Sequence, residues 1–135
     1  MAETLSRVVY VEDEPDIQAI VRIALEAIGG LQVTIFNSGQ EAIARAADQQ
    51  PQLLVLDVMM PGLDGPSTLR LLREQTRLQQ VPAIFMTAKA QPQEIEQLLR
   101  QGAIAVVSKP FDPMQLAEQL QRHWQQWQQQ GAEIK

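Results

Sequence analysis

The sequence predicts an α/β fold, in which five helices cover the two faces of a doubly wound, five-stranded parallel sheet. Three observations favour this fold. Five short apolar runs alternate with five helical patterns, which is typical of parallel strands joined by right-handed crossover helices. The central runs barely alternate between apolar and polar residues, as expected for strands buried on both faces. Hydrophobic residues make up 45% of the 135 residues, enough for one core and one domain.

The predicted strands are short runs rich in Val, Ile, Leu or Phe. They cover Arg7–Val11, Gln32–Phe36, Leu53–Asp57, Pro82–Thr87 and Ala105–Ser108. The third, "LLVLD", is the most apolar of the five and should lie deepest in the sheet.

The first two helices are predicted from apolar spacing and from signals at their ends. Apolar residues recur every three or four positions between Pro15, near the start of the first helix, and Gly29-Gly30, which should end it. Ser38 is a candidate N-cap for the second helix, which ends before Pro51.

The remaining three helices carry similar signals. Pro66 suits the first turn of the third helix, Gly102 ends the fourth, and Asp112-Pro113 opens the fifth. The turn residue Asp64 precedes the third helix. An apolar stripe on the fifth helix comprises Leu116, Leu120, Trp124 and Trp127. Residues 1–135 therefore form a single predicted domain, with a core at about 5–127 and a Gln-rich helix end and tail over 128–135.

Polar side chains follow four of the five predicted strands. Glu12 and Asp13 follow the first strand, Asp57 ends the third, Thr87 ends the fourth, and Lys109 follows the fifth. Because parallel strands end at one edge of the sheet, which is where such folds bind ligands, we expect these groups to meet there.

Two or three carboxylates in a chain without cysteine form a hard oxygen site. This donor set suits Mg²⁺, with Mn²⁺ also possible, and disfavours zinc. A metal, the Lys109 ammonium and the Thr87 hydroxyl around Asp57 could hold a phosphoryl group. Asp57 is the best candidate nucleophile, because it ends the most apolar strand.

Four short motifs carry a resemblance to a known family. They are "VEDE" after the first strand, "LLVLDVMMPGLDG" around Asp57, "MTA" at 86–88 and "SKPF" at 108–111. In this order, they resemble receiver domains of bacterial two-component response regulators, in the style of the chemotaxis regulators, over about residues 5–127. The resemblance implies a flavodoxin-like strand order, 2-1-3-4-5.

The resemblance also implies a signalling switch rather than an enzyme. Asp57 would accept a phosphoryl group from a phosphohistidine of a sensor histidine kinase or phosphotransfer protein, and the domain would then change its binding to a downstream protein. Mg²⁺ would be held by Asp13, Asp57 and the backbone carbonyl of Met59, with Glu12 acting directly or through water.

The resemblance implies further roles at the other strand ends. Lys109 would bind the phosphoryl oxygens, Thr87 would follow the phosphoryl group, and the bond between Lys109 and Pro110 would be cis. One residue departs from the pattern: Val106 stands where many receivers carry an aromatic switch residue.

Three alternatives stay open at this point. One is a Mg²⁺-dependent phosphohydrolase of the haloacid-dehalogenase type, although that class carries a D-x-D after its first strand and this chain has "VEDE". A flavin-binding relative is disfavoured by the acidic first loop. The third is a receiver cut from a longer regulator with an output domain.

Composition limits the partners. The net charge of -5 and a pI near 4.8 argue against direct binding to nucleic acid or to anionic membranes. The polar start "MAETLSR" lacks an apolar signal core, and no apolar run approaches a membrane span. We therefore expect a cytoplasmic protein, monomeric or weakly dimeric, with no membrane insertion.

Overall fold

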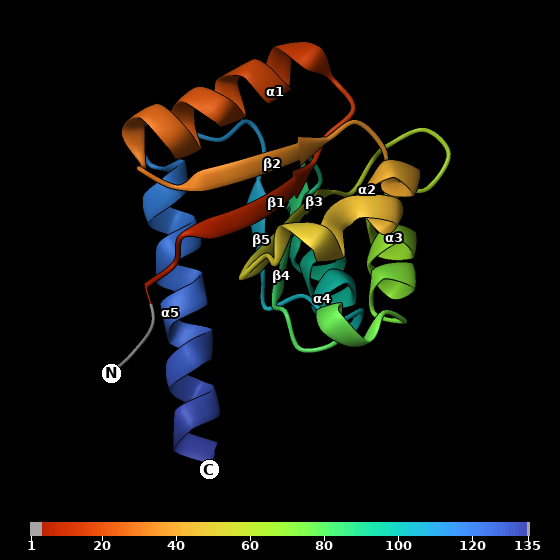
Figure 1. Ribbon diagram of the computed structural model, residues 1–135, viewed down its shortest axis with the longest axis vertical. Coiled ribbons are helices and arrows are strands. Elements are labelled where there is room, and N and C mark those ends of the chain that lie inside the picture. Colours follow the sequence, from red (N-terminus) through yellow and green to blue (C-terminus); the bar gives the residue numbers. More distant parts are fainter. Residues whose placement is uncertain (1–3, 135) are drawn as a thin grey trace.

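A parallel five-stranded sheet forms the centre of the molecule, as the computed structural model shows for residues 4–134, with side chains described through Gly131. The strand order is β2-β1-β3-β4-β5, as predicted (Figure 1). The strands are β1 (Arg7–Val11), β2 (Gln32–Phe36), β3 (Leu53–Asp57), β4 (Ala83–Thr87) and β5 (Ala105–Ser108). The fourth strand begins one residue later than predicted, because Pro82 has no N–H to donate; its carbonyl accepts the N–H of Leu54 at 2.9 Å.

Five α-helices connect and follow the strands within the described residues, as predicted. They are α1 (Pro15–Arg22), α2 (Gly39–Arg45), α3 (Gly65–Leu72), α4 (Pro92–Arg100) and α5 (Leu116–Ile134). Three segments have other helical geometries: the π-helical η1 (Ile23–Ile28), which continues α1, and the 3-10 segments η2 (Ala46–Gln49) and η3 (Thr76–Leu78).

Side-chain caps fix the starts of α2 and α3. The predicted N-cap Ser38 is confirmed, because its hydroxyl oxygen accepts the N–H of Glu41 at 3.1 Å. Interpreting Asp64 only as a turn residue was incomplete, since its carboxylate accepts the N–H of Ser67 at 2.8 Å and caps α3. An oxygen at this position satisfies one of the free N–H groups of the first helical turn.

The last helix begins four residues later than predicted. The Asp112 carboxylate accepts the N–H of Met114 at 2.9 Å, so these residues form a turn before α5 starts at Leu116. Trp124 is buried and its indole N–H donates to the carbonyl of Gln52 at 3.0 Å, so it packs in the core as expected for the predicted apolar stripe. Trp127 is partly buried against the same cluster.

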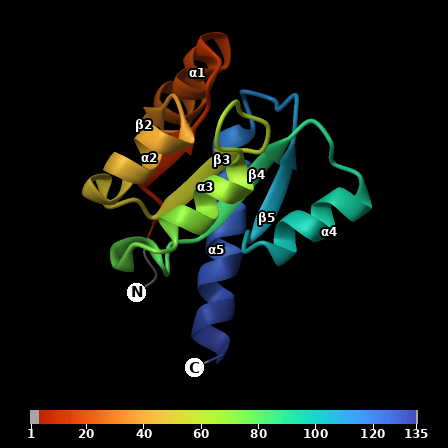
Figure 2. The same cartoon turned by 90° about the vertical axis from the view of Figure 1, so that its right-hand side faces the viewer.

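The helices cover the sheet in two layers. One apolar cluster joins the sheet to α1, η1 and α5, and the other joins it to α2, α3 and α4. Figure 2 shows α4 lying at the outside of its layer, where Leu98 is its one buried residue. No helix in the described part of the chain is long and apolar enough to cross a membrane.

Candidate functional site

Three carboxylates meet at the carboxyl edge of the sheet, where the sequence predicts them. Glu12 and Asp13 follow β1, and Asp57 ends the neighbouring strand β3. One oxygen of each residue lies within 4.8 Å of one oxygen of the others. Glu12 and Asp57 are buried, and Asp13 is half-buried.

Lys109 joins this cluster from the loop after β5. Its ammonium nitrogen lies 2.7 Å from Asp57 Oδ1 and 3.4 Å from Glu12 Oε1. The bond between Lys109 and Pro110 is cis, as predicted. Residues that follow two other strands, β1 and β5, thus converge on Asp57 at the end of β3.

Burial and like charge raise the pKa of both buried carboxyls. Burial raises the pKa of Asp57, and the charges of Asp13 and Glu14 add to this, while the hydrogen bond and charge of Lys109 oppose it. Burial also raises the pKa of Glu12; the N–H of Glu14 opposes this, and the charge of Asp57 adds to it. For both groups the pKa lies above its ordinary value. Burial therefore outweighs the opposing effect of Lys109 on both carboxyls.

The same charges act on their cationic and phenolic neighbours. Burial lowers the pKa of Lys109, but hydrogen bonds and ion pairs with Asp57 and Glu12 together have the larger, opposite effect. The pKa of Lys109 therefore lies above its ordinary value, and the ammonium stays charged. Burial raises the pKa of Tyr10, on β1, and the charges of Glu12 and Asp57 raise it more. The site carries an excess of negative potential that a cation would offset.

Thr87 and Met59 lie at the same edge of the sheet, but the Thr87 side chain is buried and the Met59 side chain is exposed. Thr87 ends β4 and is buried, and its hydroxyl oxygen accepts the N–H of Lys89 at 3.0 Å. Met59 lies two residues past Asp57 in the loop before α3, with an exposed side chain. The metal role of its carbonyl stays a prediction. Val106, on β5, is partly buried.

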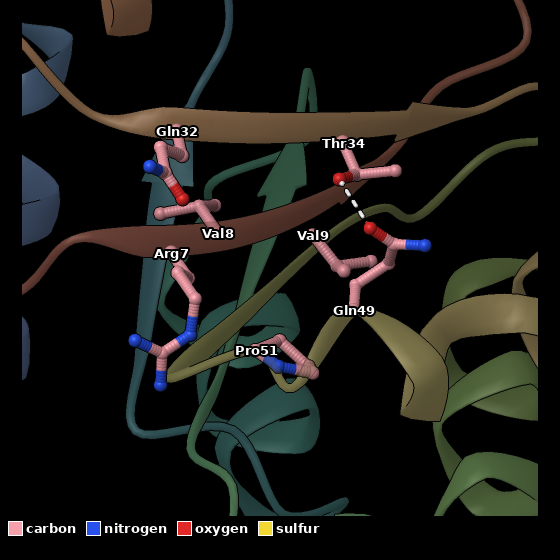
Figure 3. Close-up of a pocket in the computed structure, with 7 residues that line it drawn as sticks. All are labelled: Arg7, Val8, Val9, Gln32, Thr34, Gln49 and Pro51. Carbon is pink, nitrogen blue, oxygen red and sulfur yellow. Dashed lines mark hydrogen bonds between the residues drawn. The ribbon is translucent and has the colours of Figure 1, made fainter.

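A small pocket elsewhere on the sheet shares no residue with this cluster (Figure 3). Arg7 and Gln32, at the starts of β1 and β2, line it. So do Thr34 and Gln49, and the Thr34 hydroxyl donates a 3.2 Å hydrogen bond to Gln49 Oε1. These strand starts lie at the opposite ends of the strands from Glu12 and Asp57. The carboxylate edge is therefore the better candidate site.

The family model described as the response regulator receiver domain matches residues 8–121. The chain belongs to this family of signalling domains. It is 37% identical, over 86% of its length, to the response regulator Rre1 of Synechocystis, of which it covers 50%. It thus spans about half the length of several curated regulators that it matches.

Solved receiver structures share the fold. The chemotaxis response regulator CheY4 of Vibrio cholerae has a TM-score of 0.81 and 28% identity, with 89% of this chain and 99% of that chain covered. The receiver domain of the sensor histidine kinase PA1611 of Pseudomonas aeruginosa has a TM-score of 0.78 and 31% identity, with 90% and 98% covered. That structure is described as having a magnesium ion coordinated in its active site cleft.

The donor set of this receiver domain fits Mg²⁺. Oxygens bound to Mg²⁺ at about 2.1 Å lie roughly 3 to 4 Å apart, so small side-chain movements would bring the three carboxylate oxygens from within 4.8 Å of one another to ligand positions. Burial chiefly raises the pKa values of Glu12 and Asp57, and like charges add to this, so a bound cation would offset the cost of ionising these carboxyls. Glu12, Asp13 and Asp57 are thus the residues that could hold the metal.

Replacing Asp13 by Ala should weaken Mg²⁺ binding roughly tenfold or more, because one charged oxygen ligand is lost. The metal-free protein should become more stable, because the remaining carboxylates, whose burial already disfavours ionisation, repel one less charge. Thermal unfolding with EDTA and with millimolar Mg²⁺ measures both effects, since a ligand at ten times its Kd adds about 1.4 kcal/mol.

Asp16→Ala is the matched control, because it removes an equal charge from an exposed position three residues further on. It should keep most of the Mg²⁺-dependent gain in melting temperature. A wild-type protein whose melting temperature ignores millimolar Mg²⁺ would contradict the metal assignment.

Two residues that matter to this edge carry no clear sequence signal. Gly65 is buried against the carbonyl of Asp57, and a Cβ there would lie 2.5 Å from that oxygen. Gln18, on α1, donates its side-chain N–H to the carbonyl of Glu12 at 2.6 Å. Each contact joins a helix to the end of the strand just before it. Neither is marked by a motif, and the "DG" pair at 64–65 alone indicates no more than a turn.

Proposed function

We propose that this chain is a phosphorylation-controlled signalling switch in which Asp57 accepts a phosphoryl group. The observation that carries the proposal is the 2.7 Å contact between Lys109 Nζ and Asp57 Oδ1, inside a cluster with two further carboxylates. The phosphoryl donor would be a phosphohistidine of a sensor histidine kinase or phosphotransfer protein. The phosphorylated domain would then change its affinity for a downstream protein.

The chemistry is an in-line displacement at phosphorus. A bond forms between an Asp57 carboxylate oxygen and phosphorus while the P–N bond of the phosphohistidine breaks, and its electron pair leaves with the imidazole. Lys109, already in contact with Asp57, would bind the phosphoryl oxygens and offset their charge. Mg²⁺, when bound by Glu12, Asp13, Asp57 and the carbonyl of Met59, would supply additional positive charge.

Further parts of the proposal concern the whole protein. Residues 5–127 would form the receiver core within a single domain spanning 1–135. The domain would act through protein partners, without direct binding to nucleic acid, and would be cytoplasmic. Longer relatives include one named as a phosphate regulon transcriptional regulatory protein, in Rhizobium meliloti, so this receiver could also belong to a longer regulator.

One experiment separates this function from a phosphohydrolase. The protein is incubated with Mg²⁺ and acetyl phosphate, and its mass is measured; in parallel it is incubated with p-nitrophenyl phosphate. A switch gains at most one phosphoryl group per chain and releases little nitrophenol. Sustained turnover of the ester, with no phosphorylated protein, would favour the phosphohydrolase.

Phosphorylation should loosen the backbone from Lys89 to Glu96. If the Thr87 hydroxyl turns to the phosphoryl group, it loses the N–H of Lys89, now 3.0 Å away. The start of α4 has little else to hold it, since its N-cap Gln91 makes no side-chain cap and Leu98 is its one buried residue. Val106 has a small β-branched side chain and cannot move a large surface between solvent and core.

Amide hydrogen exchange with and without beryllofluoride tests this expectation. Exchange should speed up in residues 89–96 and change little at Val106. The first and second helices serve as internal controls. Unchanged exchange in 89–96, with the response confined to those two helices, would show that the signal leaves by another face.

A further inference from the structure

The side chain of Gln18 links two loops at the carboxyl edge of the sheet. Its Nε2 donates one hydrogen bond to the backbone carbonyl of Glu12, at 2.6 Å, and another to Asn37 Oδ1, at 2.7 Å. The amide nitrogen has two hydrogens, and both are used. Glu12 lies in the loop after β1, and Asn37 lies in the loop after β2.

With the bond from Gln18, the backbone N–H, the backbone carbonyl and the carboxylate of Glu12 each have a partner. Its N–H donates to the carbonyl of Phe36 at 3.0 Å, and its carbonyl accepts from Gln18. Its carboxylate accepts the N–H of Glu14 at 3.1 Å and lies 3.4 Å from Lys109 Nζ. The position of Asp13 depends on the same backbone, because its N–H belongs to the peptide group that includes the Glu12 carbonyl.

Asn37 is itself anchored to the start of α2. Its backbone N–H donates to Glu41 Oε1 at 3.0 Å, while the backbone N–H of Glu41 donates to the capping oxygen of Ser38 at 3.1 Å. A chain of hydrogen bonds therefore runs from the cap of α2, through Asn37 and Gln18, to the carbonyl of Glu12.

An uncharged donor suits this position. Glu12, Asp13 and Asp57 already repel one another, and a further carboxylate beside them would add to the repulsion. A cation would compete with the metal for the same oxygens. The glutamine amide holds the backbone without changing the charge of the site.

We propose that Gln18, braced by Asn37, is a positioning residue for the metal loop of Glu12 and Asp13. It contacts neither the metal nor the phosphoryl group; it holds the backbone that presents two of the carboxylates. The inference rests on the proposed function only in that this site binds Mg²⁺. Groups that orient metal ligands from outside the first layer typically change metal affinity 10- to 100-fold when removed.

Gln18→Met tests the proposal, because it keeps the length and apolar stem of the side chain and removes the donor without changing charge. Mg²⁺ affinity is measured by isothermal titration calorimetry, and metal-free stability by melting in EDTA. We expect Mg²⁺ binding to weaken roughly tenfold while the metal-free melting temperature changes little. Metal-free amide exchange should speed up at residues 12–14.

Asn37→Ala provides a second, milder variant at an exposed position. It removes the brace and leaves the bond from Gln18 to Glu12, so Mg²⁺ binding should weaken roughly two- to threefold. In the double variant, Asn37→Ala should add little to the loss caused by Gln18→Met, because both act through one chain of bonds. Gln97→Ala, at an exposed position on α4, is the control and should bind Mg²⁺ as the wild type does.

The outcomes separate the inference from the proposed function. Wild-type Mg²⁺ affinity in Gln18→Met overturns the inference alone. A lower metal-free melting temperature with unchanged affinity also overturns it, because it shows that Gln18 only stabilises the fold. A wild-type protein that binds no Mg²⁺ overturns the metal site itself, and the inference with it.

Discussion

Replacing Asp57 by Asn should abolish uptake of a phosphoryl group from acetyl phosphate in the presence of Mg²⁺. The amide nitrogen and oxygen of Asn are poor nucleophiles at phosphorus, and the variant also loses the charge that binds Lys109 at 2.7 Å. Within the cluster, the other contact of this lysine, to Glu12 Oε1, is longer, at 3.4 Å. The mass of the intact protein, measured before and after incubation, gives the result.

The variant should remain folded, and its metal-free stability should not fall at neutral pH. The pKa of Asp57 is raised above its ordinary value of 3.8, so the folded protein holds the proton more tightly than the unfolded chain does. Ionisation of this carboxyl therefore destabilises the fold at pH values above the raised pKa. Any gain in stability from Asp57→Asn in EDTA should disappear as the pH falls below the ordinary value.

Asp64→Asn is the matched control for this change. Asp64 caps α3 through its carboxylate, and Asn is an equally good cap, so this variant should fold and gain a phosphoryl group as the wild type does. Phosphorylation of Asp57→Asn at the wild-type rate would show that the acceptor lies elsewhere.

The sequence predicted the strands and the carboxylate edge closely because both depend on local patterns. Buried strands read as short apolar runs, and the ends of parallel strands lie at one edge whatever the loops do. Ser108 and Asp57 end β5 and β3 at the predicted positions for this reason. The motifs carry the resemblance on which the proposed phosphoryl chemistry rests, and the cis bond at Pro110, which the resemblance implies, is confirmed.

Two features were not predicted from the sequence, one for a local reason and one because it depends on a contact between separate segments. The π-helical segment η1 has the same apolar spacing as the end of an ordinary α-helix, so nothing in the sequence of Ile23–Ile28 indicates its geometry. The contact between Gln18 and Asn37 joins helix α1 to the loop after the neighbouring strand β2. Such contacts arise only when the crossovers place β1 beside β2. A glutamine on a helix is otherwise an ordinary surface residue.

Replacing Gly65 by Ala should have the largest effect on the fold of any single methyl addition at this edge. The Cβ would lie 2.5 Å from the carbonyl oxygen of Asp57 and 3.0 Å from the Cα of Val58. Both neighbours are backbone atoms, so no side-chain rotation relieves the contact. The backbone of Gly65 does not adopt a positive φ, so the cost comes from crowding alone. We expect the free energy of unfolding to fall by roughly 3 kcal/mol.

The same substitution should slow phosphorylation beyond what the lost stability explains. Gly65 begins α3 and donates its N–H to the carbonyl of Val58 at 3.0 Å, so the helix start and the end of β3 are fixed against each other. Moving them apart displaces Asp57 from Lys109, although neither residue is changed. Gly131→Ala in α5 is the control: among the described residues, no atom outside the neighbouring backbone of its own helix lies within 4 Å of the added Cβ, and Ala favours a helix. Denaturant unfolding and the rate of phosphorylation by acetyl phosphate, both measured where the variant is folded, test the two halves. A Gly65→Ala protein with wild-type stability and rate would show that β3 and α3 can separate without moving the acceptor.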